Sequence, residues 1–520
     1  MEGQVVAPHR LLNLNFEVFE RQMNLKRDEH LTALAGERNL RSLAVKGATA
    51  TFIGQTTKAL LQILSLAILA RLLLPEDFGL IAMVTAVTGF IMVFKDLGLS
   101  TATIQRQEVN QEQISTLFWI NVGIGAALMF LTVLLAPSVG WFYGDDRVVS
   151  ATGFLSVGFL LTGFTVQHNA LLRRRMKLVS VAIVEISSMV VGLFVAIACA
   201  LGDLGYWSLV YMNLAIAATS AIGVWVACDW RPTRPTKNAG IATMLVFGGD
   251  VTLAGVLNYV VRNSDNIIIG RSIGAEALGL YSRAYSLLML PIGQLTAPLT
   301  AVAVPVLSRL QSDSGSYSSF YLRALKTLAY CSMPIVTLLG SLSHEIIAVI
   351  LGSNWESVGS IFKILSIAAF FSPVGSTVGW LYISSGQTRR MLIWTAITAP
   401  ITVVFFLIGS LWGVFGIAAS YSILVTIQIV PQFWFAVKSS SIELRDVLAT
   451  LRNPILVSIG LCIETLAMRE LVLPYGSIWT LVACSISSIL FGFAVAKIFP
   501  PIMADLRHIL SFRDVAKKTI

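Results

Sequence analysis

Long apolar runs fill most of the chain after Lys46, and they constrain its fold more than any other feature. Most are about 20 residues long, which is what an α-helix needs to cross the hydrocarbon core of a bilayer. Transmembrane β-strands would be shorter and would alternate polar and apolar residues, which these runs do not. Only 12% of the residues are charged, about half the level of soluble domains. The sequence therefore predicts an all-α polytopic membrane protein.

About fourteen transmembrane helices are expected, separated by short loops with charged residues, proline and glycine. An even number would place both ends of the chain on one side of the membrane. The expected spans are 47–73, 78–104, 113–136, 151–172, 179–201, 206–227, 241–269, 284–307, 325–345, 361–383, 392–411, 414–437, 454–468 and 477–499.

These spans group into two six-helix bundles followed by two further helices. The segment WRPTRPTKNAG, rich in proline and basic residues, separates the bundles. The expected organisation is a cytoplasmic tail (1–46), a first six-helix half (47–228), a cytoplasmic linker (229–240), a second six-helix half (241–437), a second cytoplasmic linker (438–453), two extra transmembrane helices (454–499) and a cytoplasmic tail (500–520).

The net charge of +9 is explained by loops on one side of the membrane. Clusters such as Arg173-Arg174-Arg175 and Arg389-Arg390 fall in alternate loops, and cytoplasmic loops of membrane proteins carry such an excess of basic residues. We therefore expect both termini to be cytoplasmic and no nucleic-acid partner. The other loops are short and carry aromatic residues, which we interpret as interfacial anchors: Trp141, Trp355 and Trp412.

Several chemistries are excluded by missing motifs. The chain has no phosphate-binding loop of the Gly-x-x-x-x-Gly-Lys-Ser/Thr type. The segment His344-Glu345 begins like a zinc-protease helix, but Ala348 stands where the second histidine belongs. The five cysteines are scattered without paired spacing. We expect no cofactor, no metal, no catalytic residue and no enzymatic activity.

A short motif occurs twice, 200 positions apart, which indicates that the two bundles follow one plan. In both copies an arginine ends a span, and a turn with an acidic residue begins the next helix. We interpret this motif as a structural turn that holds the first two helices of each half together. Its copies are Arg71, Glu76, Gly79 and Leu80, and Arg271, Glu276, Gly279 and Leu280.

The same offset aligns two polar stripes inside the membrane. Lys58 and Gln62 correspond to Asn258 and Arg262, and Asp265 continues the second stripe. Steps of three and four residues put each set on one helix face. A central Arg, Lys or Asp costs about 2.5 to 3.5 kcal/mol on translocon scales, so we expect both stripes to line a cavity and bind substrate.

Other roles for these charged residues stay open. Arg262 and Asp265 could neutralise each other between packed helices, and Lys58 could extend its amine to the membrane surface. Asp250, near the start of its span, could cap the helix or bind a coupling cation, a role that Asp265 could also have. Glu185 is expected to be an isolated, hydrogen-bonded carboxyl group.

Three stretches together resemble the Wzx-type polysaccharide flippases, closest to the colanic-acid and xanthan exporter branch of the multidrug/oligosaccharidyl-lipid/polysaccharide superfamily. They are LAILARLLLPEDFGLIAMVTAVTGFIMVFKDLGLSTATIQR, NSDNIIIGRSIGAEALGLYSRAYSLLMLPIGQLTAPLTAVAVPVLSRLQ and ILGSNWESV. The resemblance implies a V-shaped pair of bundles, as in the MATE transporters, in a bacterial inner membrane. It also implies alternating access and flipping of undecaprenyl-diphosphate-linked oligosaccharides, with a polymerase and a chain-length regulator as partners.

Two other functions fit parts of the pattern. A multidrug or small-molecule antiporter of the same superfamily would share the charged halves, but more often stops at about twelve spans. A membrane-embedded polysaccharide polymerase or ligase would favour large outer loops with clustered arginine, histidine or acidic residues, and the outer loops here are short.

Overall fold

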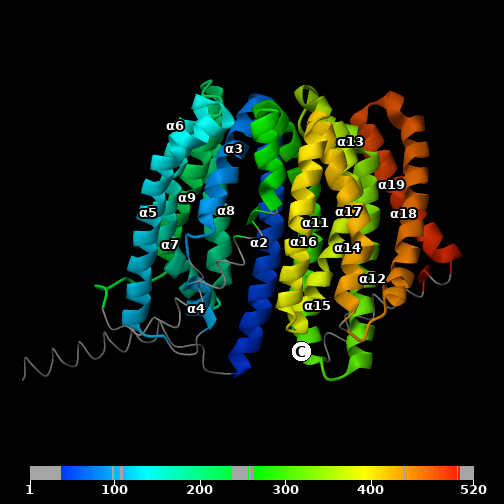
Figure 1. Cartoon of the computed structure of the whole chain (residues 1–520), viewed down its shortest axis with the longest axis horizontal. Helices are drawn as coiled ribbons and strands as arrows, with labels where there is room; N and C mark the ends of the chain where they lie inside the picture. Colours follow the sequence, from blue (N-terminus) through cyan, green and yellow to red (C-terminus); the bar gives the residue numbers. More distant parts are fainter. Residues whose placement is uncertain are drawn as a thin grey trace, which may run out of the picture. The chain divides into compact units, whose positions relative to one another are not determined.

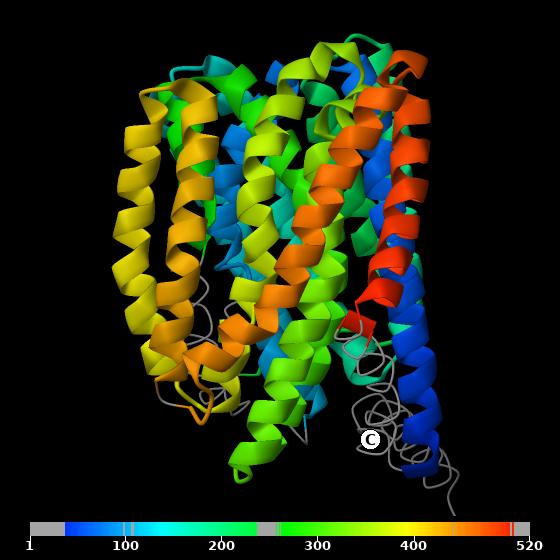
Figure 2. The same cartoon turned by 90° about the vertical axis from the view of Figure 1, so that its right-hand side faces the viewer.

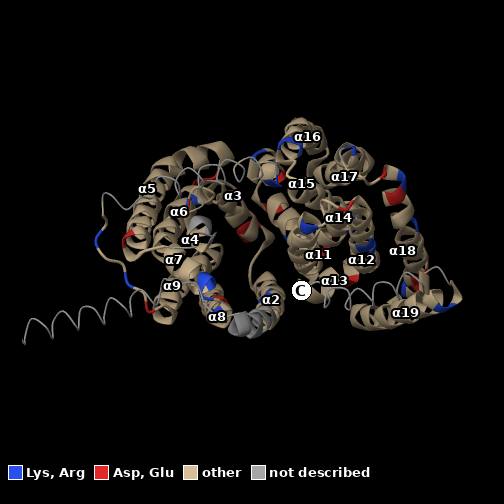
Figure 3. Cartoon of the chain, turned by 90° about the horizontal axis from the view of Figure 1, so that it is seen from below, with Lys and Arg blue, Asp and Glu red and all other residues tan. Residues whose placement is uncertain are grey.

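The structure, a computed structural model, describes residues 37–96, 99–105, 109–236, 256, 259–260, 262–438, 440–499 and 502–503. These residues are mainly helical and include no strand, which confirms the all-α prediction. Within them, 12 helical segments are long and apolar enough to cross a membrane. The chain is therefore a multi-pass membrane protein. Most of the ribbon carries no charged residue (Figure 3).

The chain divides into two compact units. The first comprises residues 1–61 and 84–260, and the second comprises residues 62–83 and 261–520. The division passes through α2 (Glu37–Leu72) and α3 (Pro75–Met92). The segment Gln62–Met83, which includes the first copy of the repeated turn, therefore packs with the second unit.

In the first unit, local hydrogen bonds fix the start of α5 (Gln111–Tyr143). Asn110 accepts a hydrogen bond from the Gln113 amide at 2.8 Å, and the Gln113 side chain accepts from the Asn110 amide at 3.3 Å. This capping box satisfies two amides that the helix itself cannot pair. The helices of this unit after α3 are α4 (Leu99–Gln105), α5 (Gln111–Tyr143), α6 (Asp146–Leu155), α7 (Val157–Arg174), α8 (Leu178–Leu201) and α9 (Trp207–Ala227).

The expected continuous span over 78–104 is wrong. α3 ends at Met92 and a separate helix, α4, begins at Leu99. Asp96 accounts for the new start, because its carboxylate accepts hydrogen bonds from both the amide and the hydroxyl of Ser100. A carboxylate in this position satisfies unpaired amides at a helix N-terminus. Hydropathy alone does not reveal such a cap.

The second unit packs around a buried cluster of aromatic and aliphatic side chains that includes Tyr321, Met333, Trp380 and Phe433. Figure 1 labels the helices among its elements. They are α11 (Ala275–Arg309), α12 (Ser314–Ser341), α13 (Ser343–Ile350), η1 (Ser353–Trp355), α14 (Glu356–Ser376), α15 (Val378–Ser384), α16 (Thr388–Ser410), α17 (Gly413–Val437), α18 (Leu444–Val472), η2 (Leu473–Tyr475) and α19 (Ser477–Ile498).

The two extra helices, α18 and α19, form a hairpin (Figures 1 and 2). α18 begins at Leu444, inside the segment expected to be a linker, with Asp446 in its first turn. A buried ion pair attaches the hairpin: Arg469 donates to Glu345 of α13 at 2.7 Å, and the Glu345 side chain is 3% exposed. Glu345 belongs to the segment that begins like a zinc-protease helix, and its observed contact is this structural ion pair.

Arg469→Met is expected to lower the free energy of unfolding by about 3 to 5 kcal/mol, because it leaves the buried Glu345 carboxylate without its counter-ion. Glu470→Gln is the matched control. Glu470 pairs with the same guanidinium at 3.6 Å but its side chain is 75% exposed, so its loss should cost less than about 1 kcal/mol. Unfolding of both variants in detergent measures the difference, and equal effects would contradict it.

Candidate functional site

The second unit contains a buried acidic group, Asp265. Asp265 is on the helical stretch 262–272 and is 6% exposed. Its Oδ2 accepts a hydrogen bond from the Tyr281 hydroxyl of α11 at 3.0 Å, and its Oδ1 accepts from the Asn266 amide at 2.7 Å. No ion pair joins Asp265 to Arg262 within the described residues. The possibility that these two groups neutralise each other is therefore not what the structure shows.

A row of tyrosines extends from Asp265 across the unit. Tyr281 and Tyr285 are one helical turn apart on α11 and stack with ring centroids 6.3 Å apart. Tyr285 meets Tyr421 of α17 edge to face at 6.1 Å. We call Asp265, Tyr281, Tyr285 and Tyr421 the tyrosine row. Each of these tyrosines has an apolar ring that packs against its neighbours and a polar hydroxyl. Such side chains suit the lining of a protein interior that contacts a polar substrate.

Arg262 lies next to this row and is exposed. It lies three residues before Asp265 on the same helical stretch, so the two side chains share one helix face. It makes no hydrogen bond or ion pair with the part of the chain that the structure describes. A guanidinium in such a position can bind a phosphate through two parallel N–H bonds.

Lys58, expected as a substrate-binding cation, is paired in the first unit. Its Nζ lies 3.2 Å from Glu185 Oε2, and Arg173 Nη2 lies 3.3 Å from the other carboxylate oxygen. Glu185 is thus not isolated, and that expectation is wrong. The side chains of Lys58 and Glu185 are 37% and 33% exposed. Because neither side chain is buried, an anionic ligand can also reach the lysine.

Two variants separate a ligand-binding role of Lys58 from a structural one. Lys58→Ala should abolish polymer export, whereas Glu185→Gln, which breaks the same ion pair but keeps the lysine, should retain most of it. Export by cells that carry only the variant protein, normalised to its amount in the membrane, measures this. Equal loss of export in both variants would mean that the pair itself is what matters.

The remaining predicted site residues have mixed outcomes. Gln62 is exposed on α2, one turn beyond Lys58. Asn258 and Asp250 lie outside the described residues. Their proposed roles in substrate binding and in cation coupling therefore stay predictions.

The two copies of the repeated turn meet each other. A Cβ added to Gly79 of α3 would lie 1.6 Å from the Ala275 carbonyl oxygen, and one added to Gly279 of α11 would lie 1.9 Å from the Pro75 carbonyl oxygen. The backbones of α3 and α11 therefore touch at two glycines that the repeat relates, as small residues permit in membrane helices. We call this contact the glycine crossing.

Neighbouring side chains hold the α2–α3 turn beside the crossing. Arg71 donates to the Val349 carbonyl at 3.0 Å. The Trp355 indole donates to the Ala70 carbonyl at 2.7 Å, and its ring packs edge to face on Phe78 at 5.3 Å. Trp355 is 0% exposed, so its prediction as an interfacial anchor is wrong.

Two other predicted anchors and two residues of the repeated turn have exposed side chains. Among the predicted anchors, Trp141 is 84% and Trp412 is 69% exposed. Of the repeat residues, Arg271 and Glu276 are exposed in the second turn.

A family model described as polysaccharide biosynthesis protein matches residues 68–360, more than half of the chain. The chain belongs to the polysaccharide biosynthesis protein family. The match covers both copies of the repeated turn, Arg262 and Asp265, together with Tyr281 and Tyr285 of the tyrosine row.

Individual relatives agree with this assignment. The teichuronic acid biosynthesis protein TuaB of Bacillus subtilis is 26% identical over 67% of this chain and 73% of its own length. The lipopolysaccharide biosynthesis protein WzxC of Escherichia coli is 21% identical over 77% of this chain and 82% of its own. The succinoglycan biosynthesis transport protein ExoT of Rhizobium meliloti is 22% identical over 68% and 72%. The resemblance to Wzx-type proteins is confirmed.

Two solved structures share the fold. The lipid II flippase MurJ, in an inward closed conformation, superposes with a TM-score of 0.68 at 14% identity and covers 87% of this chain and 99% of its own. An inward-facing MATE transporter of the MOP superfamily gives a TM-score of 0.59 at 16% identity, over 74% of this chain and 93% of its own. These likenesses confirm a helical fold of that superfamily.

Proposed function

We propose that this protein is a flippase, which moves undecaprenyl-diphosphate-linked oligosaccharides from the cytoplasmic to the outer leaflet of a bacterial inner membrane. The observation that carries the proposal is Arg262, an exposed cation one helical turn before Asp265 of the tyrosine row, in a chain of the polysaccharide biosynthesis family. The diphosphate must cross hydrocarbon, and a guanidinium can bind it there. The termini lie on the cytoplasmic side in this proposal.

The relatives support a transport role. ExoT is named as a transport protein of succinoglycan biosynthesis, and a Shigella flexneri relative is named as an O-antigen transporter. The relatives are named after different polymers. If all of these proteins recognise one common feature of their substrates, we infer that it is the lipid diphosphate rather than the sugars. Arg262 and Lys58 are the candidates for binding the diphosphate.

Alternating access about the substrate site is part of the proposal. Transporters built from repeats move one half against the other around a central site. The glycine crossing, at which α3 and α11 touch, lies within the second unit. In such a cycle it would keep these two helices together, as small residues permit in membrane helices.

Asp265 is the candidate for coupling the cycle to an ion gradient. Buried carboxylates in membrane proteins often carry protons or cations. Asp265→Asn keeps an acceptor for the Tyr281 hydroxyl but removes the negative charge. In vesicles with an imposed proton or sodium gradient, wild-type transport should respond to the gradient and the variant should not. A variant that responds as strongly as wild type would exclude Asp265 from coupling.

Deletion of the gene tests the function in the cell that makes the polymer. Polymer export should stop, and lipid-linked oligosaccharides should accumulate in the membrane, because synthesis on the cytoplasmic side continues. Thin-layer or mass-spectrometric analysis of extracted lipids measures the accumulation. Loss of drug resistance with normal polymer export would instead favour the antiporter.

A further inference from the structure

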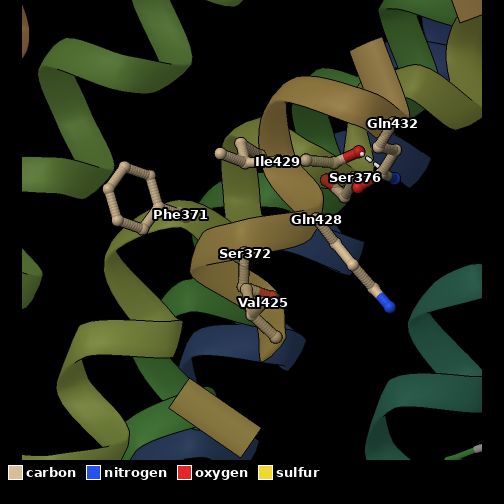
Figure 4. A pocket seen from close by; sticks show the side chains of 8 residues that line it. Phe371, Ser372, Ser376, Val425, Gln428, Ile429 and Gln432 are labelled. Atoms are coloured by element: carbon tan, nitrogen blue, oxygen red, sulfur yellow. Dashed lines mark hydrogen bonds between the residues drawn. The ribbon is translucent and has the colours of Figure 1, made fainter. Parts of the chain in front are cut away.

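A second polar feature of the second unit is a cavity of about 230 Å³ between α14 and α17. Ser372 and Ser376 are one turn apart on α14, and Gln428 and Gln432 are one turn apart on α17. Figure 4 shows these side chains around the cavity, with the ring of Phe371 on another side. We call it the α14–α17 pocket.

The pocket presents hydrogen-bonding groups that the protein itself uses only in part. Gln432 donates to the Gly375 carbonyl at 3.1 Å, and Ser376 donates to the Pro373 carbonyl at 2.6 Å. Gln428 and Ser372 make no side-chain hydrogen bond with any residue that the structure describes. In Figure 4, Gln428 extends away from Gln432. A primary amide and a hydroxyl on transmembrane helices are costly unless a polar partner meets them.

The chemistry of the lining selects the kind of ligand. None of the described lining residues is charged, so the pocket does not suit a diphosphate, which needs cations. An acyl chain would leave the Gln428 amide and the Ser372 hydroxyl unpaired. A sugar ring offers hydroxyls that both donate and accept, and an apolar face that can lie on Phe371. The volume of about 230 Å³ gives room for a single sugar ring.

We propose that the α14–α17 pocket binds one sugar residue of the transported oligosaccharide through its hydroxyls, an inference that rests on the proposed function. Gln428 and Ser372 supply the free amide and hydroxyl, and Gln432 supplies its carbonyl oxygen. The lining of this neutral subsite includes neither Arg262 nor Lys58, so the diphosphate and the sugar are recognised by different side chains.

Native mass spectrometry of the full-length protein tests the subsite with two probes. One is the lipid-linked oligosaccharide fraction extracted from cells that make the polymer, and the other is undecaprenyl diphosphate. The wild type should bind the sugar-bearing lipid about tenfold more tightly, as two or so hydrogen bonds allow. In the double variant Gln428→Leu, Gln432→Leu this preference should fall to nearly one, with the affinity for undecaprenyl diphosphate unchanged.

The outcomes separate the subsite from the function. A double variant that keeps the tenfold preference, or a wild type that has none, overturns the subsite. A wild type that binds neither lipid overturns the proposed function as well. Because the double variant could misfold, Ser372→Ala and Gln428→Leu are measured singly, and each should lower the preference without lowering the melting temperature. Ile429→Leu, an apolar change in the same lining, is the control and should leave both affinities unchanged.

Discussion

Gly279→Ala is expected to destabilise the protein by about 2 kcal/mol and to abolish export. The new methyl carbon would lie 1.9 Å from the Pro75 carbonyl oxygen, which no pair of non-bonded atoms can tolerate. α3 and α11 would have to move apart, and overpacking of this kind costs typically 1 to 3 kcal/mol. Gly79→Ala should act in the same way, because its methyl would lie 1.6 Å from the Ala275 carbonyl oxygen.

The same helix offers a matched control for this prediction. Gly293 is also on α11, and a Cβ there would have nothing within 4 Å. Gly293→Ala should therefore be neutral or stabilise the helix by up to about 1 kcal/mol, as alanine does in a helix interior. Melting temperature in detergent and export in cells measure both variants. If Gly279→Ala melts and exports like Gly293→Ala, the glycine crossing is not a close contact in the working protein.

Arg262→Gln is expected to reduce export by more than about tenfold, with little change in stability. Hydrogen bonds to charged groups contribute about 1.5 to 3 kcal/mol. Arg262 makes none with the described part of the chain. Its replacement should therefore weaken substrate binding rather than the folded structure. Arg262→Lys should retain part of the activity, because it keeps the charge but not the two-pronged geometry.

Arg309→Gln is the control for this loss of charge. Arg309 is an exposed arginine in the last turn of α11, and its replacement should leave export near the wild-type level. Exported polymer per unit of membrane-inserted protein is the measurement. Arg262→Gln cells that export as much polymer as wild-type cells would remove Arg262 from the substrate site.

The sequence predicts the spans well because length and hydropathy decide membrane insertion. The helices α8, α9 and α17 begin and end within one residue of the expected spans. The break between α3 and α4 escapes such a prediction, since it depends on the hydrogen bonds from Ser100 to one carboxylate, that of Asp96. Local side-chain chemistry of this kind is not visible in an average over about 20 residues.

The candidate site was predictable only in part. The 200-residue repeat identified Gly79 and Gly279 as equivalent, but not that their backbones touch. Asp265 stood out as an intramembrane charge, whereas its partner Tyr281 looks in the sequence like any core aromatic residue. The four-residue spacing of Tyr281 and Tyr285 after the charged stretch was the available signal. Contacts with Tyr421, far along the chain, depend on tertiary packing.

The most direct test of the flippase proposal follows the lipid itself between leaflets. Purified protein is reconstituted into vesicles with the lipid-linked oligosaccharide from the producing cells, and a membrane-impermeant hydrolase that cleaves the diphosphate is added outside. With wild-type protein, the lipid that was protected in the inner leaflet should become cleavable, and with Arg262→Gln it should stay protected. If the protected fraction is the same with wild-type protein as in protein-free vesicles, the chain does not flip this lipid.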